Sequence, residues 1–270
     1  MAFLKGVLQV TGSIKGVSFY TPVGSDKVIM RTKGGASKDR IATGAEFEGL
    51  RKHQVEWAGC VEFARAARGA VGELYRLADY NLSPVWTGLA KKLIKLDTKS
   101  DIGKRNIKLT NFKQALEGFN LNKKNPITSV LGVSPRFEIH RDALEAIVTF
   151  PRINTQVDLL NFQRLPYFRL LICLGGISDV MYNPGPIRNY EAENPKLQGM
   201  FVSNISKWHS TNDIIPSHTM TVKFDENTQS MMSNDISLIL SIGVEFGNHC
   251  FGGGISEGKR SGCAKIIAVG

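Results

Sequence analysis

Cysteine and long apolar runs are scarce in this chain of 270 residues, and each shortage excludes a class of protein. The cysteines have no short paired spacing, so the sequence predicts neither a zinc cluster nor a disulfide framework. They are Cys60, Cys173, Cys250 and Cys263. No stretch approaches the roughly 20 apolar residues that a membrane-spanning helix needs, so we expect a globular protein with no membrane span.

Motifs that carry chemistry are also rare. The sequence contains no Gly-x-Ser-x-Gly elbow, no His-Glu-x-x-His zinc motif and no calcium loop with alternating oxygen ligands. His249, Cys250 and Cys263 could meet across a final hairpin, but neighbours on a strand point to opposite faces and are poor co-ligands. We therefore predict no catalytic residue, no cofactor site and no metal site. A fold can still assemble a site from distant residues, but the motifs predict a protein that is not an enzyme.

Residues 253–259 have the glycine and lysine spacing of a phosphate-binding P-loop. Arg260 stands where that loop needs a Ser or Thr to hold magnesium. The residues after Arg260 have the composition of a strand, whereas a P-loop needs a helix whose N-terminus faces the phosphates. This segment is therefore predicted to be the hairpin loop between the last two strands.

Positive charge is concentrated in the first half of the chain, which has a formal net charge of +10 overall. Residues 1–125 hold 22 Lys and Arg against 11 Asp and Glu, whereas residues 126–270 hold 12 against 13. A field of that size attracts nucleic acid, an anionic membrane or an acidic protein surface. A solvated, solubilising face is the alternative interpretation.

Three runs rich in β-branched and aromatic residues predict a small β-meander at 7–10, 17–20 and 27–31. Such a sheet needs a cover. The cover is either the helix that follows or another molecule, because edge strands carry unpaired N–H and C=O groups. In the second case the arm would make its contacts through Val17, Phe19, Tyr20, Ile29 and Arg31.

Residues 43–79 predict the main helix. Thr43 and Glu46 have the spacing of a capping box, which marks a helix start, and an interruption is expected near Gly69 and Gly72. Side chains at alternating spacings of three and four then share one mainly apolar stripe. The stripe consists of Phe47, Leu50, Gln54, Trp57, Val61, Ala64, Arg68, Val71, Tyr75 and Ala78.

Ser83 followed by Pro84 predicts the start of a second helix. Basic side chains gather on both helical segments and could follow a phosphate backbone. They include Arg65, Arg68, Arg76, Lys92, Lys95 and Lys99. No helix-turn-helix, zinc finger or aromatic RNA-binding motif accompanies them, so such binding would be indifferent to sequence and sensitive to salt.

The polar segment that ends at Asn125 and Pro126 lies where the charge balance changes, and it predicts a boundary between domains at 1–125 and 126–270. Beyond it, seven strand candidates are separated by turn-rich links. They are 137–140, 143–150, 168–174 extending toward Tyr182, 200–205, 219–224, 236–246 and 264–269.

We predict an α+β fold, with an N-terminal β-meander plus helices followed by an antiparallel immunoglobulin-like β-sandwich. Between residues 237 and 242, one set of alternate positions holds Ser237, Ile239 and Ser241, and the other holds Leu238, Leu240 and Ile242. This alternation predicts a strand buried on one face.

The order of these features resembles uncharacterised proteins that are abundant in Bacteroidetes genomes. In those sequences a glycine-punctuated β arm precedes a basic Arg-x-Lys-Gly-Gly run and a helix. The matching residues here are Gly12, Ile14, Gly16, Phe19 or Tyr20, Arg31, Lys33, Gly34, Gly35 and the segment that starts near Phe47. The resemblance supports the layout and implies no activity.

The leading functional hypothesis is a structural or assembly protein that associates with copies of itself or with a larger particle through its arm and sandwich. The alternative is a sequence-indifferent nucleic-acid-binding protein that acts through the basic helices. Lys5 and Gly6 interrupt the apolar run that a secretory signal would need, so we expect a cytoplasmic protein unless export uses another route.

Overall fold

The structure is a computed structural model that describes residues 2–4, 11–32, 34–185 and 188–270. Contacts divide the chain into two compact units, Met1–Arg51 and Lys52–Gly270, and we describe each by itself. The boundary predicted between residues 125 and 126 falls inside the second unit. The predicted strand at 7–10 lies outside the described residues.

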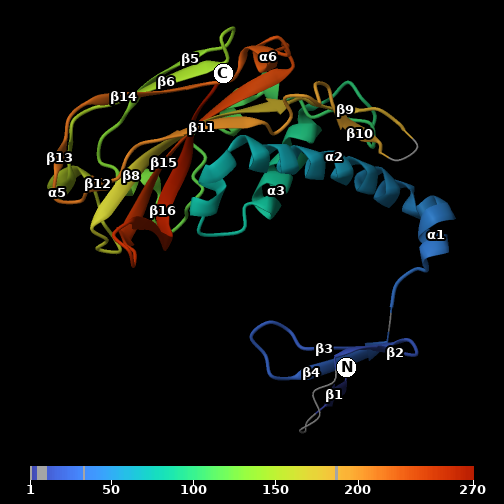
Figure 1. Cartoon of the computed structure of the whole chain (residues 1–270). Helices are drawn as coiled ribbons and strands as arrows, with labels where there is room; N and C mark the ends of the chain where they lie inside the picture. The colour runs from blue at the N-terminus through green and yellow to red at the C-terminus, as the bar shows by residue number, and fades with distance from the viewer. Residues whose placement is uncertain (1, 5–10, 33, 186–187) are drawn as a thin grey trace. The chain divides into compact units, whose positions relative to one another are not determined.

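The first unit is a small antiparallel sheet followed by short helical turns (Figure 1). Its strands are β1 (Ala2–Leu4), β2 (Gly12–Ile14), β3 (Val17–Tyr20) and β4 (Val28–Thr32), in the order β1-β4-β3-β2. The helix α1 (Lys38–Thr43) and the 3-10 helix η1 (Ala45–Phe47) lead into α2 (Glu48–Ala70), whose residues from Lys52 onward belong to the second unit.

The predicted capping box does not form. Ser37 caps α1 by accepting a hydrogen bond from the Arg40 N–H at 3.2 Å, so a helix already begins before Thr43. Thr43 ends that helix and donates its hydroxyl to the Asp39 carbonyl at 2.8 Å. Glu46 accepts from the Arg40 guanidinium at 3.0 Å instead of reaching back to a cap.

The helices of the second unit lie close to their predicted positions in the sequence. The interruption expected near Gly69 and Gly72 is present, since α2 ends at Ala70 and a 3-10 helix, η2 (Gly72–Leu77), follows. The second predicted helix is α3, and the segment that follows it up to residue 125 contains only short helical turns. The remaining helical elements are α3 (Ser83–Leu93), η3 (Ile94–Leu96), η4 (Leu109–Asn111), η5 (Lys113–Ala115), α4 (Ile127–Val130), α5 (Thr155–Asp158) and α6 (Glu226–Gln229).

All seven predicted strands are confirmed. They are β5 (Arg136–His140), β6 (Glu145–Phe150), β8 (Tyr167–Ser178), β11 (Phe201–Ile205), β14 (His218–Lys223), β15 (Ile236–His249) and β16 (Ile255–Val269). Five short strands complete the set: β7 (Ile153–Asn154), β9 (Val180–Tyr182), β10 (Tyr190–Ala192), β12 (His209–Ser210) and β13 (Ile214–Ile215).

The second unit has three layers: helices, a five-stranded antiparallel sheet and a three-stranded antiparallel sheet. The large sheet has the order β11-β8-β15-β16, with β12 also paired to β8, and the small sheet has the order β14-β6-β5. One core joins the two sheets and includes Phe150, Leu240 and Val222. A second core joins the large sheet to α2, η2 and α3. Figure 1 shows α2 and α3 beside that sheet. The prediction of an α+β fold with antiparallel C-terminal sheets is therefore confirmed.

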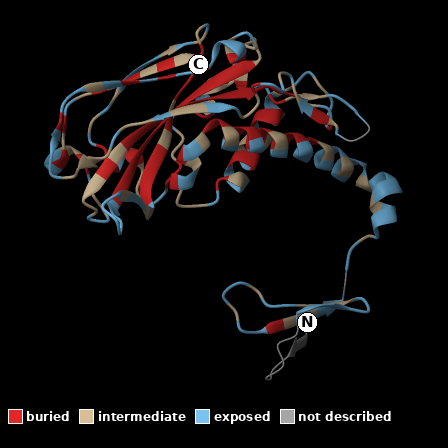
Figure 2. Cartoon of the chain, viewed as in Figure 1, coloured by how far each residue is buried: buried red, intermediate tan, exposed pale blue. Residues whose placement is uncertain are grey.

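The helical layer changes the burial that the sequence predicts for β15. Leu240 lies in the core between the sheets and Ile239 lies in the core under the helices, so both faces of the strand are buried (Figure 2). The prediction of one exposed face for Ser237 to Ile242 is wrong because η2 and η4 pack against the serine face. The hydroxyls of Ser237 and Ser241 are buried there without a hydrogen-bond partner in the described part of the chain.

Small residues allow α2 to approach the large sheet closely. A Cβ atom at Gly175 in β8 would overlap the carbonyl oxygen of Ala70 at the end of the helix. The buried face of α2 accordingly consists mainly of small residues with few large ones. It comprises Glu56, Gly59, Cys60, Phe63, Ala64, Ala66, Ala67 and Ala70.

The predicted apolar stripe of α2 is wrong in its first half. Leu50, Trp57 and Val61 are 43%, 52% and 48% exposed, whereas Val71 is buried as expected. The helix turns its small side chains to the sheet because these permit the close contact, and this leaves several large apolar ones outside. Among the described residues, no helix is both long and apolar enough to span a membrane.

Candidate functional site

The sheet of the first unit has one mainly apolar face and one face of mixed character. Directly opposite residues of an antiparallel pair lie on the same face, and Phe19 is paired with Met30 while Val17 is paired with Ile14. One face therefore carries Ile14, Val17, Phe19, Val28 and Met30. We call this set the apolar arm face.

The apolar arm face has almost no core of its own. Val28 is the single residue of this face classed as buried, at 4% exposure. Ile14 is 59% exposed, and Val17, Phe19 and Met30 are half-buried. Figure 2 shows the described part of this sheet as intermediate or exposed apart from the start of β4.

The five predicted arm residues divide between the two faces. Val17 and Phe19 belong to the apolar arm face, whereas Tyr20, Ile29 and Arg31 lie on the opposite one. On that mixed face the Arg31 guanidinium carbon lies 5.2 Å from the centre of the Tyr20 ring. Val17 and Phe19, on the mainly apolar face, are the predicted residues best placed for an apolar contact.

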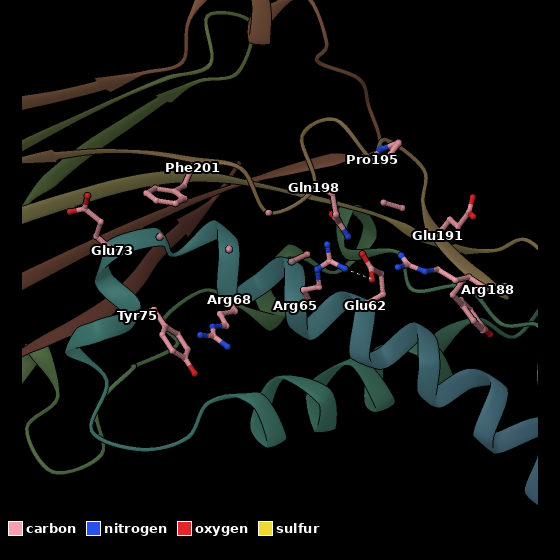
Figure 3. A pocket seen from close by; sticks show the side chains of 16 residues that line it. Glu62, Arg65, Arg68, Glu73, Tyr75, Arg188, Glu191, Pro195, Gln198 and Phe201 are labelled. Carbon is pink, nitrogen blue, oxygen red and sulfur yellow. Dashed lines mark ion pairs between the residues drawn. The ribbon is translucent and has the colours of Figure 1, made fainter.

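The second unit contains an open cavity of about 940 Å³ beside α2 and η2, which we call the arginine cavity (Figure 3). One wall comes from α2 and η2 and the other from the segment that runs from β10 to β11. The lining side chains with functional groups or aromatic rings are Glu62, Arg65, Arg68, Glu73, Tyr75, Arg188, Tyr190, Glu191, Gln198 and Phe201.

Glycines allow the two walls of the arginine cavity to lie in close contact. A Cβ atom at Gly69 would overlap the backbone of Gly199, and one at Gly72 would overlap the ring of Phe201. Gly72 has φ +50°, a conformation that favours glycine. The ring of Phe201 is therefore held against η2, although the residue remains 40% exposed.

The polar groups of the arginine cavity are only partly satisfied. Arg65 lies 3.8 Å from the Glu62 carboxylate, and the Arg68 guanidinium lies 4.6 Å from the centre of the Tyr75 ring. Gln198 accepts a hydrogen bond from the Ser178 N–H at 2.8 Å. Its amide nitrogen is buried with no acceptor in the described part of the chain, so it is an unpaired donor that a ligand could satisfy.

Two of the predicted basic contacts, Arg65 and Arg68, meet in this cavity, and Arg76 does not. Arg76 donates to the buried carboxylate of Glu245, so it is committed to the fold and is unavailable as a free phosphate contact. Lys92, Lys95 and Lys99 are exposed on and after α3. Of these, Lys99 lines a smaller cavity of about 240 Å³.

Glu245 is the centre of a charge network in the large sheet. Arg169 donates to it at 2.8 Å and also binds Glu257, while the guanidinium of Arg169 lies 4.3 Å from the ring centre of Trp208. Burial lowers the pKa of Arg76, and Glu257 opposes that shift. This network joins η2, β8, β15 and β16. Each of its charged groups has a partner of opposite charge within the network.

A second buried carboxylate, Glu56 in α2, is bound by three donors. Arg105 donates to its two oxygens at 2.7 and 2.8 Å, the Gly103 N–H at 2.9 Å and Lys91 at 2.9 Å. Burial alone raises the pKa of Glu56, but hydrogen bonds from Arg105, Gly103 and Lys91 outweigh it and lower the pKa to about 2. This cluster ties α3 and the loop after it to α2.

His209 and His218 lie near each other, with ring centroids 6.1 Å apart, but they do not form part of a larger ligand cluster among the described residues. Within the described residues, no group of three or more His, Cys, Asp or Glu is arranged to hold a metal ion. His249 instead contacts the Tyr167 hydroxyl at 3.0 Å, Cys250 is exposed and Cys263 is buried. Burial raises the pKa of the Cys263 thiol to about 12, so it is not a nucleophile at neutral pH.

The segment that resembles a P-loop was predicted to be the loop of the last hairpin, but only its first residues lie in the turn between β15 and β16, and residues 255–259 belong to β16. The turn covers residues 250–254, where the Cys250 N–H donates to the Gly254 carbonyl at 2.9 Å, and β16 already begins at Ile255. A strand therefore follows the glycines in place of the helix that a P-loop requires.

Sequence reasoning missed the residues of the second cavity wall. Arg188, Gln198 and Phe201 lie far from α2 in the sequence and have no spacing that links them to Arg65 or Arg68. The one local signal was Asn183-Pro184-Gly185-Pro186, a strong turn that precedes this wall.

Comparison with protein-family models, with curated proteins and with solved structures finds no match to this chain. The resemblance to Bacteroidetes proteins, carried by the glycine-punctuated arm, stays a prediction.

Proposed function

We propose that this protein is a structural component that associates with copies of itself through the apolar arm face. The observation that carries the proposal is a four-stranded sheet with several apolar side chains on one face and only Val28 buried there among its described residues. A small sheet of this kind needs an apolar cover for stability.

A second copy offers a matching cover. Two identical sheets that pack face to face about a twofold axis each bury the same apolar surface, which is the self-complementary arrangement of a symmetric dimer. Such packing is the ordinary construction of a β-sandwich. Arg31 and Tyr20 on the opposite, mixed face would remain in solvent. The strand order leaves β1 and β2 as edges, so further copies can add by edge pairing.

Replacing Phe19 with lysine in the full chain should shift the protein toward monomers. A lysine at this position would bring a charge into the interface that the ring would otherwise fill, and burial of such a ring is worth about 1.5–3 kcal/mol per copy. We expect the dissociation constant of the assembly to rise at least about tenfold. Light scattering coupled to size-exclusion chromatography over a concentration series measures it.

Ser18→Lys is the matched control, because Ser18 is the next residue and faces the other side of the same strand. It should leave the mass distribution unchanged. If the two variants dissociate alike, or if the unmodified chain is monomeric at every concentration, the apolar arm face is not a self-association surface. An assembly that needs an added partner would identify a larger particle as the cover.

Nucleic-acid binding is a second candidate, favoured by the exposure of Arg65, Arg68 and Lys92 on one unit. The logarithm of the affinity for a single or double strand should fall linearly with the logarithm of salt concentration. Arg65→Gln with Arg68→Gln should reduce that slope by about 1 for each phosphate contact that the substitutions remove. Lys196→Gln, an exposed position outside the cavity, should not change it. Absence of a mobility shift at low salt would contradict this candidate.

A further inference from the structure

The arginine cavity has different chemistry at its two ends and in its middle. In the close-up, Glu73 and Phe201 lie at one end, Arg188 and Glu191 at the other, and Arg65, Glu62 and Gln198 between them (Figure 3). A volume of about 940 Å³ is ample for a small molecule with a ring and a charged group.

The lining of the cavity is rich in hydrogen-bond donors. Arg68 has no carboxylate partner among the described residues and stacks on Tyr75, and the amide nitrogen of Gln198 is buried without an acceptor there. Arg65 lies 3.8 Å from Glu62, a surface pair that is worth little. These groups match a compact anion with several acceptor oxygens, such as a phosphate.

The end that carries Phe201 suits a planar ring with N–H donors. Phe201 lies against Gly72, so its position is fixed while its surface is 40% exposed to a stacking partner. Glu73 is an exposed acceptor next to it, and a carboxylate accepts readily from the amino edge of a nucleobase.

The charge of the lining limits the length of an anionic ligand. Three arginines face three glutamates around the cavity, so its field does not favour a long polyanion. A ligand with one localised anionic group and a neutral ring fits this balance better than an extended strand.

We infer that the arginine cavity binds a nucleoside phosphate, with the phosphate at Arg65, Arg68 and Gln198 and the base stacked on Phe201 with its amino edge at Glu73. A free nucleotide is the expected ligand; one unit of a single strand presents the same base and phosphate but adds charges that this balance does not favour. The inference is independent of self-association, because the apolar arm face belongs to the other unit.

Isothermal titration calorimetry of the full chain tests the inference with guanosine, adenosine and uridine monophosphate, inorganic phosphate and a short single-stranded RNA. The purine monophosphates should bind at least about tenfold more tightly than inorganic phosphate, since base stacking adds to the ionic contact. Arg68→Gln should weaken binding by about tenfold because it removes a charged contact. Glu73→Gln should reduce the difference between the bases and leave phosphate binding unchanged.

Two further variants test whether binding depends on the cavity itself or only on exposed positive charge. Phe201→Leu keeps an apolar side chain against Gly72 and should lose the preference for nucleotides over phosphate. Lys196→Gln removes an exposed charge outside the cavity and should bind as the unmodified protein does. The thermal unfolding midpoint of each variant shows whether it is folded.

Binding of the RNA without the monophosphates, weakened by Arg68→Gln and Phe201→Leu, would identify a strand as the source of the nucleotide. Nucleotides that bind no more tightly than inorganic phosphate would overturn the inference, and so would an equal loss of affinity in Arg68→Gln and Lys196→Gln. Loss of self-association in Phe19→Lys with nucleotide binding intact would show that the two sites are separate.

Discussion

Replacing Gly175 with alanine should destabilise the second unit by about 3 kcal/mol, the upper part of the range for overpacking a core. The added Cβ atom would overlap the carbonyl oxygen of Ala70, which is backbone and cannot rotate away. The contact lies where α2 ends on the central strand β8, and the Cys173 thiol also donates to the same oxygen at 3.6 Å. Relief would require α2 to move off the large sheet. Urea denaturation of both proteins measures the difference.

Gly88→Ala is the matched control, because it makes the same chemical change in a helix with open space around it. Alanine is favoured over glycine inside a helix, so this variant should be more stable by up to about 1 kcal/mol. If Gly175→Ala and Gly88→Ala have the same unfolding free energy, α2 does not lie as close to the sheet as the structure places it.

The sequence was sufficient to locate the strands of the second unit because their composition and turns are local signals. β14 and β15, for example, are runs of β-branched and apolar residues bounded by turns, and both lie within a few residues of prediction. The layer order was not predictable in the same way. The alternation from Ser237 to Ile242 predicted a strand with one exposed face. The same alternation arises when the serines are buried under another layer, so the sequence alone does not distinguish the two cases.

The main helix shows why periodicity can select the wrong face. Trp57 and Val61 are larger and more apolar than Ala66 and Ala70, so a hydrophobic stripe predicts that the larger side chains are buried. The close contact at Gly175 reverses this order, because only small side chains fit between the two backbones. Nothing in the helix sequence itself reveals that its partner strand carries a glycine.

The candidate sites also divide into features that local sequence predicts and features that only the tertiary structure shows. Val17 and Phe19 were predicted from local composition, and the register of β3 with β4 then separates them from Tyr20 and Arg31. The arginine cavity required tertiary structure, since its two walls come from distant segments. Arg76 looked like a neighbour of Arg68 on one surface, but the buried carboxylate of Glu245 in β15 binds it.

Replacing Glu56 with glutamine should destabilise the second unit by about 3–5 kcal/mol, the cost of removing one partner from a buried ion pair. Glu56 is fully buried, and Arg105 and Lys91 have side chains only 12% and 25% exposed. Glutamine would keep the size of the side chain but would leave both cations without a counter-charge. Glu62→Gln in the same helix is the control, and it should cost about 0–1 kcal/mol because its partner Arg65 is exposed.

The effect of Glu56 should depend on pH with a definite sign. Its pKa falls from an ordinary value of 4.5 to about 2 in the folded protein, because the hydrogen bonds from Arg105, Gly103 and Lys91 outweigh burial. A carboxyl group whose pKa is lowered by folding stabilises the fold above its unfolded pKa and loses that contribution as pH falls through the folded pKa. The stability difference between the unmodified protein and Glu56→Gln should therefore be constant near neutral pH and shrink between about pH 4.5 and 2. A difference that does not change over this interval would show that the carboxylate charge is not what holds Arg105 and Lys91 in place.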